Sequence, residues 1–178
     1  MQKMKFNQDV EGIRKRAREH VENGAVTEGY PAERASVINM LNDALATELL
    51  CVLRYRFHYY MVRGIHSEPV AAEFLEHSNE EQTHADQLAE RIVQLGGKPN
   101  FNPDTISSRS HAEFVDCDTL EDMVRENLIA ERIAIDSYRG MIEYVGMKDP
   151  TTRRMLEEIL AKEEEHADEL ADLMDGMG

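Results

Sequence analysis

Apolar residues recur at steps of three and four along four long stretches of the chain, which is the period of an α-helix with one buried face. The stretches cover residues 32–63, 69–95, 119–145 and 150–174. Glycine and proline gather between them, and no alternating strand pattern competes. The sequence therefore predicts an all-α chain with four long helices.

The connections between these helices predict how they are arranged. The first two helices and the last two are joined by short links, so each pair should form an antiparallel hairpin. The longest connection, residues 97–118, joins the two pairs. This is the ferritin-like four-helix bundle topology, with a long crossover between the second and third helices. We expect a bundle domain over residues 32–176, preceded by an N-terminal extension, residues 1–31, that contains a short amphipathic helix.

Composition narrows the class of protein. Hydrophobic residues make up 42% of the chain, as in a globular protein, and the formal net charge of −15 disfavours nucleic-acid binding by the body of the molecule. The sequence has no run of 18 apolar residues, so we expect no membrane span. The N-terminus is not followed by an apolar stretch, so we expect no secretory signal and a cytoplasmic location. The two cysteines form no Cys-x-x-Cys pair, which argues against a zinc ribbon.

Each of the four helices carries a glutamate at a position where its apolar stripe calls for a hydrophobic residue. These glutamates are Glu48, Glu81, Glu131 and Glu163. A buried carboxylate without a partner is costly, so four converging carboxylates require partners. Divalent cations are the simplest partners.

The second and fourth helices add a histidine three residues after the glutamate, giving the pairs Glu81/His84 and Glu163/His166. At this spacing both side chains project from one helix face. Four carboxylates and two imidazoles offer two metals a mixed oxygen and nitrogen environment that suits iron or manganese. Di-iron bundle proteins use this pattern. The glutamates of each half are separated by 33 and 32 residues, which suggests an internal duplication.

Two segments resemble a known family. Residues 84–100, including Leu95-Gly96-Gly97-Lys98-Pro99-Asn100, look like the second helix of bacterioferritins and its exit, and residues 155–166 look like their fourth helix. The resemblance covers residues 33–174 and extends to the wider ferritin-like group that includes rubrerythrins.

The resemblance implies a role for each candidate ligand. Glu48 and His84 would serve one iron, and Glu131 and His166 the other. Glu81 and Glu163 would bridge both ions. Tyr55 matches a tyrosine beside the di-iron site of bacterioferritins, where it could donate a hydrogen bond or an electron; a core aromatic residue is the equally weighted alternative.

Three departures separate the chain from bacterioferritins. Gln82 stands where they have a haem-ligating methionine, which argues against haem. The chain ends at Gly178, soon after the fourth helix, which weakens the expectation of a 24-subunit storage shell. The N-terminal extension is the third departure. Rubrerythrins differ more, because they have an additional glutamate on the third helix where this chain has Leu128 and Ala134 at the relevant spacing.

The sequence thus predicts a ferroxidase-type enzyme. Two Fe(II) ions per chain, with manganese as a possible substitute, would be oxidised by O2 or H2O2, for iron handling and protection against oxidative stress. A homo-oligomer, at least a dimer, is expected. Three alternatives stay open: iron storage in a shell, a rubrerythrin-like peroxide reductase, and a Dps-like DNA-protecting protein that uses the basic cluster at residues 14–18.

Overall fold

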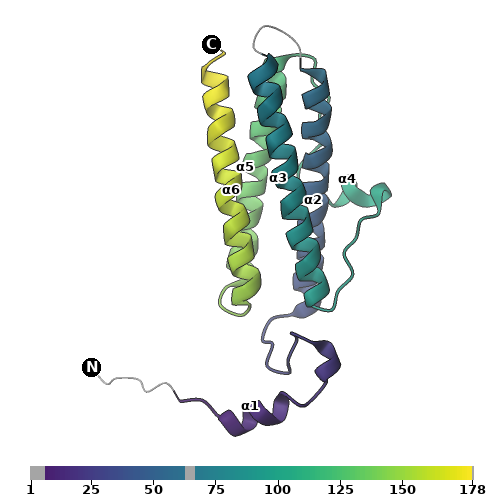
Figure 1. Ribbon diagram of the computed structural model, residues 1–178, viewed down its shortest axis with the longest axis vertical. Coiled ribbons are helices and arrows are strands. Elements are labelled where there is room, and N and C mark those ends of the chain that lie inside the picture. Colours follow the sequence, from purple (N-terminus) through teal and green to yellow (C-terminus); the bar gives the residue numbers. More distant parts are fainter. Residues whose placement is uncertain (1–6, 63–66, 178) are drawn as a thin grey trace, which may run out of the picture.

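The computed structural model describes residues 7–62 and 67–177, and these residues contain helices and no strand. Four long helices run side by side as a bundle (Figure 1). They are α2 (Arg34–Met61), α3 (Ser67–Gln94), α5 (Leu120–Val145) and α6 (Pro150–Asp175). The prediction of an all-α bundle of four long helices, with a long crossover between the second and the third, is confirmed. The division at residues 31 and 32 into two domains stays a prediction.

Two apolar clusters fill the bundle, one toward each end. The first includes Leu41, Leu88 and Leu156, and the second includes Phe74 and Leu170. Burial of one such side chain stabilises the fold by about 1.5–3 kcal/mol. On every long helix the predicted ligand positions fall between the residues of the first cluster and those of the second. The bundle therefore holds its polar residues in a layer with apolar packing on both sides.

Local signals set the ends of the helices. The Thr119 side chain accepts a hydrogen bond from the backbone of Asp122 and so caps α5, as its position before two acidic residues suggests. Pro150 occupies the first turn of α6. After α3 the chain turns at Gly96, whose φ of +76° is in the left-handed region that glycine tolerates best. These boundaries agree with the prediction to within two residues.

The crossover between α3 and α5 contains helical turns that the sequence analysis treated as irregular chain. They are η2 (Pro103–Thr105) and α4 (Ile106–Arg109), and α4 lies against α2 (Figure 1). The Asn102 side chain accepts a hydrogen bond from the backbone of Asp104 and starts the first turn. Arg109 then donates to the carbonyl oxygen of Asn42 at 2.7 Å. The tertiary contact with α2 holds this segment in place, and no local sequence pattern predicts that contact.

The N-terminal extension contains α1 (Val10–Arg16) and η1 (Val21–Asn23). A short helix here was predicted, but α1 buries none of its residues, and Ile13 is 41% exposed. The end of the extension does contact the bundle, because Tyr30 packs against the first apolar cluster.

Helix α2 is apolar and long enough, by composition and length, to cross a membrane, with a mean hydropathy of 1.4 in its most apolar window. This criterion weighs only length and composition, so it does not overturn the expectation of no membrane span. Half of that window is buried inside the bundle, and the buried residues of α2 include Glu48, Arg54 and His58. A core helix passes the same test, and we interpret α2 as one. The predicted cytoplasmic location stays a prediction.

A buried ion pair joins α3 to the start of α6. Arg91 donates to both carboxylate oxygens of Asp149 at 2.9 Å, and Tyr30 donates to the same carboxylate at 2.7 Å. Burial raises the pKa of Asp149, but hydrogen bonds from Thr152, Tyr30 and Arg91 outweigh it and bring the pKa to about 2.

Asp149→Ala is expected to destabilise the protein by about 3–5 kcal/mol, because Arg91 is left as a buried charge without its partner. Urea unfolding measures the loss, and Asp136→Ala, an exposed site, is the control. A depressed carboxylate pKa stabilises the fold above the unfolded value of about 3.9 and stops doing so as pH falls toward about 2. The difference between wild type and Asp149→Ala should therefore shrink below about pH 4. A loss below 1 kcal/mol at pH 7 contradicts this account.

Candidate metal centre

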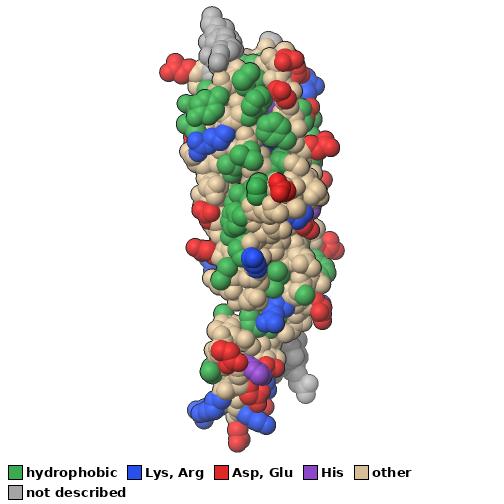
Figure 2. Space-filling view, turned by 90° about the vertical axis from the view of Figure 1, so that its right-hand side faces the viewer, with side chains coloured by type: hydrophobic (Ala, Val, Ile, Leu, Met, Phe, Trp, Pro, Cys, Tyr) green, Lys and Arg blue, Asp and Glu red, His purple; other side chains and the backbone are tan. Residues whose placement is uncertain are grey.

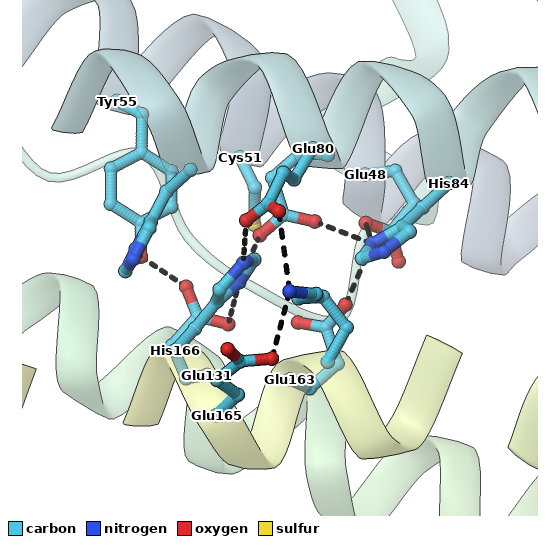
Figure 3. A network of polar contacts seen from close by, with 12 residues as sticks. Glu48, Cys51, Tyr55, Glu80, His84, Glu131, Glu163, Glu165 and His166 are labelled. Carbon is cyan, nitrogen blue, oxygen red and sulfur yellow. Dashed lines mark hydrogen bonds and ion pairs between the residues drawn. The ribbon is translucent and has the colours of Figure 1, made fainter. Parts of the chain in front are cut away.

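Six side chains from the four long helices converge in the polar layer of the bundle, and Figure 3 shows most of them pointing toward one another. Each is at most 6% exposed. They are the six predicted ligands, Glu48 on α2, Glu81 and His84 on α3, Glu131 on α5, and Glu163 and His166 on α6. The structure brings all six together.

His84 directs its Nδ1 atom at three carboxylates. This nitrogen lies 2.9 Å from Glu163 Oε1, 3.1 Å from Glu81 Oε2 and 3.6 Å from Glu48 Oε2. The Glu-x-x-His spacing of α3 produces the contact with Glu81, while the other two carboxylates come from α6 and α2.

His166 occupies the equivalent place on α6. Its Nδ1 atom lies 3.5 Å from Glu81 Oε1 and 3.9 Å from Glu131 Oε2. Its Nε2 atom lies 2.7 Å from Glu80 Oε2, and because a carboxylate only accepts, Nε2 carries the hydrogen. Such a bond from the outer ring nitrogen orients a metal-binding imidazole and leaves Nδ1 for the metal. Glu80 is a residue that the sequence analysis did not assign to the site.

The donor atoms form two overlapping groups of four. Glu48 and His84 belong to one group, Glu131 and His166 to the other, and Glu81 and Glu163 to both. The ligand atoms within each group lie within 4.8 Å of one another. This is the division that the resemblance implied, but the ligand roles themselves stay a prediction.

Three buried atoms in this centre lack a hydrogen bond among the described residues. They are Glu81 Oε1, Glu163 Oε1 and His166 Nδ1. Glu163 Oε1 is 2.9 Å from His84 Nδ1 but is not hydrogen-bonded to it. A buried polar atom without a partner costs about 1–3 kcal/mol. Cations placed among these atoms would satisfy all three, so the residues fit a pair of divalent metal ions.

Comparison with known proteins places this geometry in a family. The family model for the ferritin-like domain matches residues 38–177. The chain belongs to the ferritin-like family. It is 30% identical over 146 residues to a bacterioferritin of Mycobacterium bovis, covering 80% of this chain and 87% of the relative. It is 33% identical over 140 residues to the bacterioferritin of Brucella melitensis, and this match covers 78% of this chain and 83% of the relative.

A solved structure of similar shape is the bacterioferritin-related protein of Bacteroides fragilis, described as a dodecameric thioferritin. It superposes with a TM-score of 0.79 at 31% identity, and the match covers 83% of this chain and 89% of that one. The predicted resemblance to the ferritin-like group and its bacterioferritins is therefore confirmed.

Two carboxylates of this ferritin-like centre, Glu48 and Glu163, hold protons more tightly than an exposed glutamate does, whereas contacts with His166 and His84 lower the pKa of Glu81. Burial, and then the charge of Glu81, raise the pKa of Glu48 to about 8, and the same causes raise the pKa of Glu163. Burial alone would lower the pKa of His166, but the nearby carboxylates of Glu131 and Glu81 raise it to about 12. Protons therefore take the place of cations in the metal-free centre.

Two tyrosines hold the outer carboxylates of the ferritin-like site. The Tyr55 hydroxyl on α2 donates to Glu131 on α5, and the Tyr138 hydroxyl on α5 donates to Glu48 on α2. Tyr55 thus touches the candidate centre, as the resemblance implied, whereas Tyr138 was missed. Its position was available from the internal duplication, because Tyr138 follows Glu131 by seven residues, as Tyr55 follows Glu48.

Tyr138→Phe is expected to weaken divalent metal binding by about 10–100-fold, because Glu48 loses the bond that orients it. Anaerobic Co(II) titration measures the affinity. Tyr144→Phe, at an exposed position of the same helix, is the control. Wild-type affinity in Tyr138→Phe would show that the hydroxyl only fills space.

Proposed function

We propose that this protein binds two Fe(II) ions per chain at the six converging residues and oxidises them to Fe(III) with O2 or H2O2. The observation that carries the proposal is the pair of donor groups that share Glu81 and Glu163, together with three buried donor atoms that lack a hydrogen bond. Carboxylate and imidazole donors suit iron, and manganese is the metal that could replace it.

The chemistry of the two metal ions is an exchange of two electrons. Each Fe(II) ion loses one electron. The two electrons, together with two protons, reduce O2 to H2O2 or reduce H2O2 to two water molecules. The protein positions the two ions close together through Glu81 and Glu163, and the surrounding apolar clusters keep bulk water from the layer. Removal of Fe(II) and peroxide together is the proposed protection against oxidative stress.

An anaerobic titration tests the proposal. Fe(II) added to the metal-free protein should saturate the buried centre at two ions per chain. O2 or H2O2 should then convert both ions to Fe(III) in one rapid phase, which is monitored by the absorbance of Fe(III) in the near ultraviolet. Oxidation no faster than that of free Fe(II) in the same buffer contradicts a ferroxidase.

Metal binding should release protons, because the cations replace those held by Glu48, Glu163 and the two imidazoles. We expect about four protons per two ions at pH 7, one from each of these groups, measured with a pH-stat. The affinity should fall as pH is lowered below about 8, where Glu48 gains its proton. Binding without proton release contradicts the protonated description of the empty centre.

We further propose that the chain forms a homo-oligomer. Figure 2 faces the side of the bundle on which the crossover lies in Figure 1, and apolar side chains gather there. Exposed apolar residues of α2 and the crossover include Leu53, Met61, Phe101 and Phe114. A large exposed apolar patch marks a protein contact. The Bacteroides fragilis relative favours a closed assembly, which storage of oxidised iron requires.

Light scattering tests the assembly. An assembly with as many chains as the dodecameric relative predicts the mass of twelve chains of 20.4 kDa each. A dimer would rule out storage while leaving the ferroxidase proposal intact.

A further inference from the structure

A second group of metal-binding side chains lies outside the six residues of the buried centre. It consists of Glu73 and His77 on α3 and Glu169 on α6. The His77 Nε2 atom lies 3.0 Å from Glu169 Oε2 and 3.3 Å from Glu73 Oε1. The group spans the contact between α3 and α6, helices that the candidate centre also uses.

Two of the separations between these atoms match those of ligands on one metal ion, and all three donor atoms lie within 4.8 Å of one another. Two donors each about 2.1 Å from a metal lie about 3.0 Å apart in octahedral geometry and about 3.4 Å apart in tetrahedral geometry. The two distances from His77 Nε2, 3.0 Å and 3.3 Å, fall in that range. One imidazole and two carboxylates suit a divalent transition metal.

The second nitrogen of the His77 ring, Nδ1, is already hydrogen-bonded. This atom lies 3.2 Å from the Tyr55 hydroxyl oxygen. The single hydrogen of that hydroxyl goes to Glu131, so the oxygen accepts from His77 Nδ1–H. Nε2 then faces two carboxylate oxygens. A lone pair there would be repelled by both, so either a proton or a cation occupies the space between them.

Burial and position favour a cation arriving from solvent. The His77 side chain is 1% exposed, whereas Glu73 and Glu169 are 29% and 43% exposed. On the inner side, the His77 ring stacks on the His166 ring with a centroid distance of 4.0 Å. The two carboxylates thus open to water, and the imidazole reaches inward to the buried layer.

We propose that Glu73, His77 and Glu169 form a third cation site, at the surface between α3 and α6, that binds a divalent transition metal through one nitrogen and two carboxylates. This site is separate from the pair of ions in the proposed function. Through Tyr55 it is hydrogen-bonded to Glu131, a residue of the buried centre.

Equilibrium dialysis of the full chain against Co(II), without oxidant, tests the proposal. Wild type should bind three ions per chain, and the double variant Glu73→Gln/Glu169→Gln should bind two. His77→Gln, which keeps both carboxylates, should weaken the third ion at least 10-fold. Glu90→Gln/Glu157→Gln removes the same charge from exposed positions of the same two helices and should still bind three.

A variant of the buried centre separates this proposal from the ferroxidase proposal. Glu81→Gln/Glu163→Gln should keep one Co(II) ion, lost when Glu73→Gln and Glu169→Gln are added. Equal stoichiometry in wild type and Glu73→Gln/Glu169→Gln, with wild-type helical circular dichroism in both, overturns the third site and shows that a proton alone lies between the carboxylates. If wild type binds a single ion and Glu73→Gln/Glu169→Gln none, the third site stands and the two-ion centre fails.

Discussion

A chain that carries Glu81→Gln and Glu163→Gln is expected to bind neither ion of the buried centre and to oxidise Fe(II) at least about 100-fold more slowly than wild type. These two glutamates are the residues common to both donor groups. Glutamine keeps the size and hydrogen-bonding capacity of the side chain but removes the negative charge that a divalent cation requires. Loss of both bridging charges should therefore affect both ions at once.

Matched variants show whether the effect belongs to the centre. Glu76→Gln/Glu164→Gln changes the same charge on the same two helices at exposed positions and should oxidise Fe(II) at the wild-type rate. Single variants should each weaken both ions, because each glutamate belongs to both groups. If the buried centre of the Glu81→Gln/Glu163→Gln chain still binds two ions, these residues are excluded as ligands.

The second large effect is the difference in stability between Glu163→Gln and wild type, and the sign of this difference should depend on whether metal is bound. Without metal, Glu163→Gln should be more stable than wild type, because burial and the neighbouring Glu81 and Glu48 raise the pKa of Glu163. A carboxyl group with a raised pKa binds its proton more tightly in the folded state, so metal-free wild type loses stability as pH rises above about 4.3. Glutamine has no charge to bury, and the advantage of the variant should grow with pH.

With metal the order should invert. A ligand at 100 times its Kd adds about 2.7 kcal/mol to the folded state, which for a domain of this size raises Tm by about 5–10 °C. Wild type should show this rise with Co(II), and Glu163→Gln should show a smaller one, from the ion at Glu73, His77 and Glu169 alone. Differential scanning calorimetry at pH 6 and pH 8, with and without Co(II), measures all four cases. A metal-free Glu163→Gln chain that melts below wild type at pH 8 contradicts the description of a centre strained by like charges.

Much of the fold follows from the sequence, because the helical period, the glycine and proline breaks and the cap at Thr119 are local signals. Helix α4 was missed because it depends on contacts between Arg109 and α2, which are far apart in sequence.

The candidate ligands could be predicted for a physical reason that concerns each helix alone. A glutamate inside an apolar stripe, such as Glu48 or Glu131, conflicts with its surroundings unless something neutralises it. Glu80 gave no such signal, since a polar residue on the outer face of an acidic helix is ordinary. His77 falls at the period of the apolar stripe, between Phe74 and Glu81, so the sequence indicates its burial but not its partners. Their roles depend on which atoms of α6 lie opposite, here His166 and Glu169, and that is decided by the packing of the two helices.

The central claim is that six residues hold two iron ions inside the bundle. Anomalous scattering from a crystal grown with Fe(II) without oxygen, measured on both sides of the iron absorption edge, tests it most directly. We predict two iron peaks between Glu81 and Glu163, one beside His84 Nδ1 and the other beside His166 Nδ1. A single peak, or iron found only outside this layer of the bundle, would contradict the account.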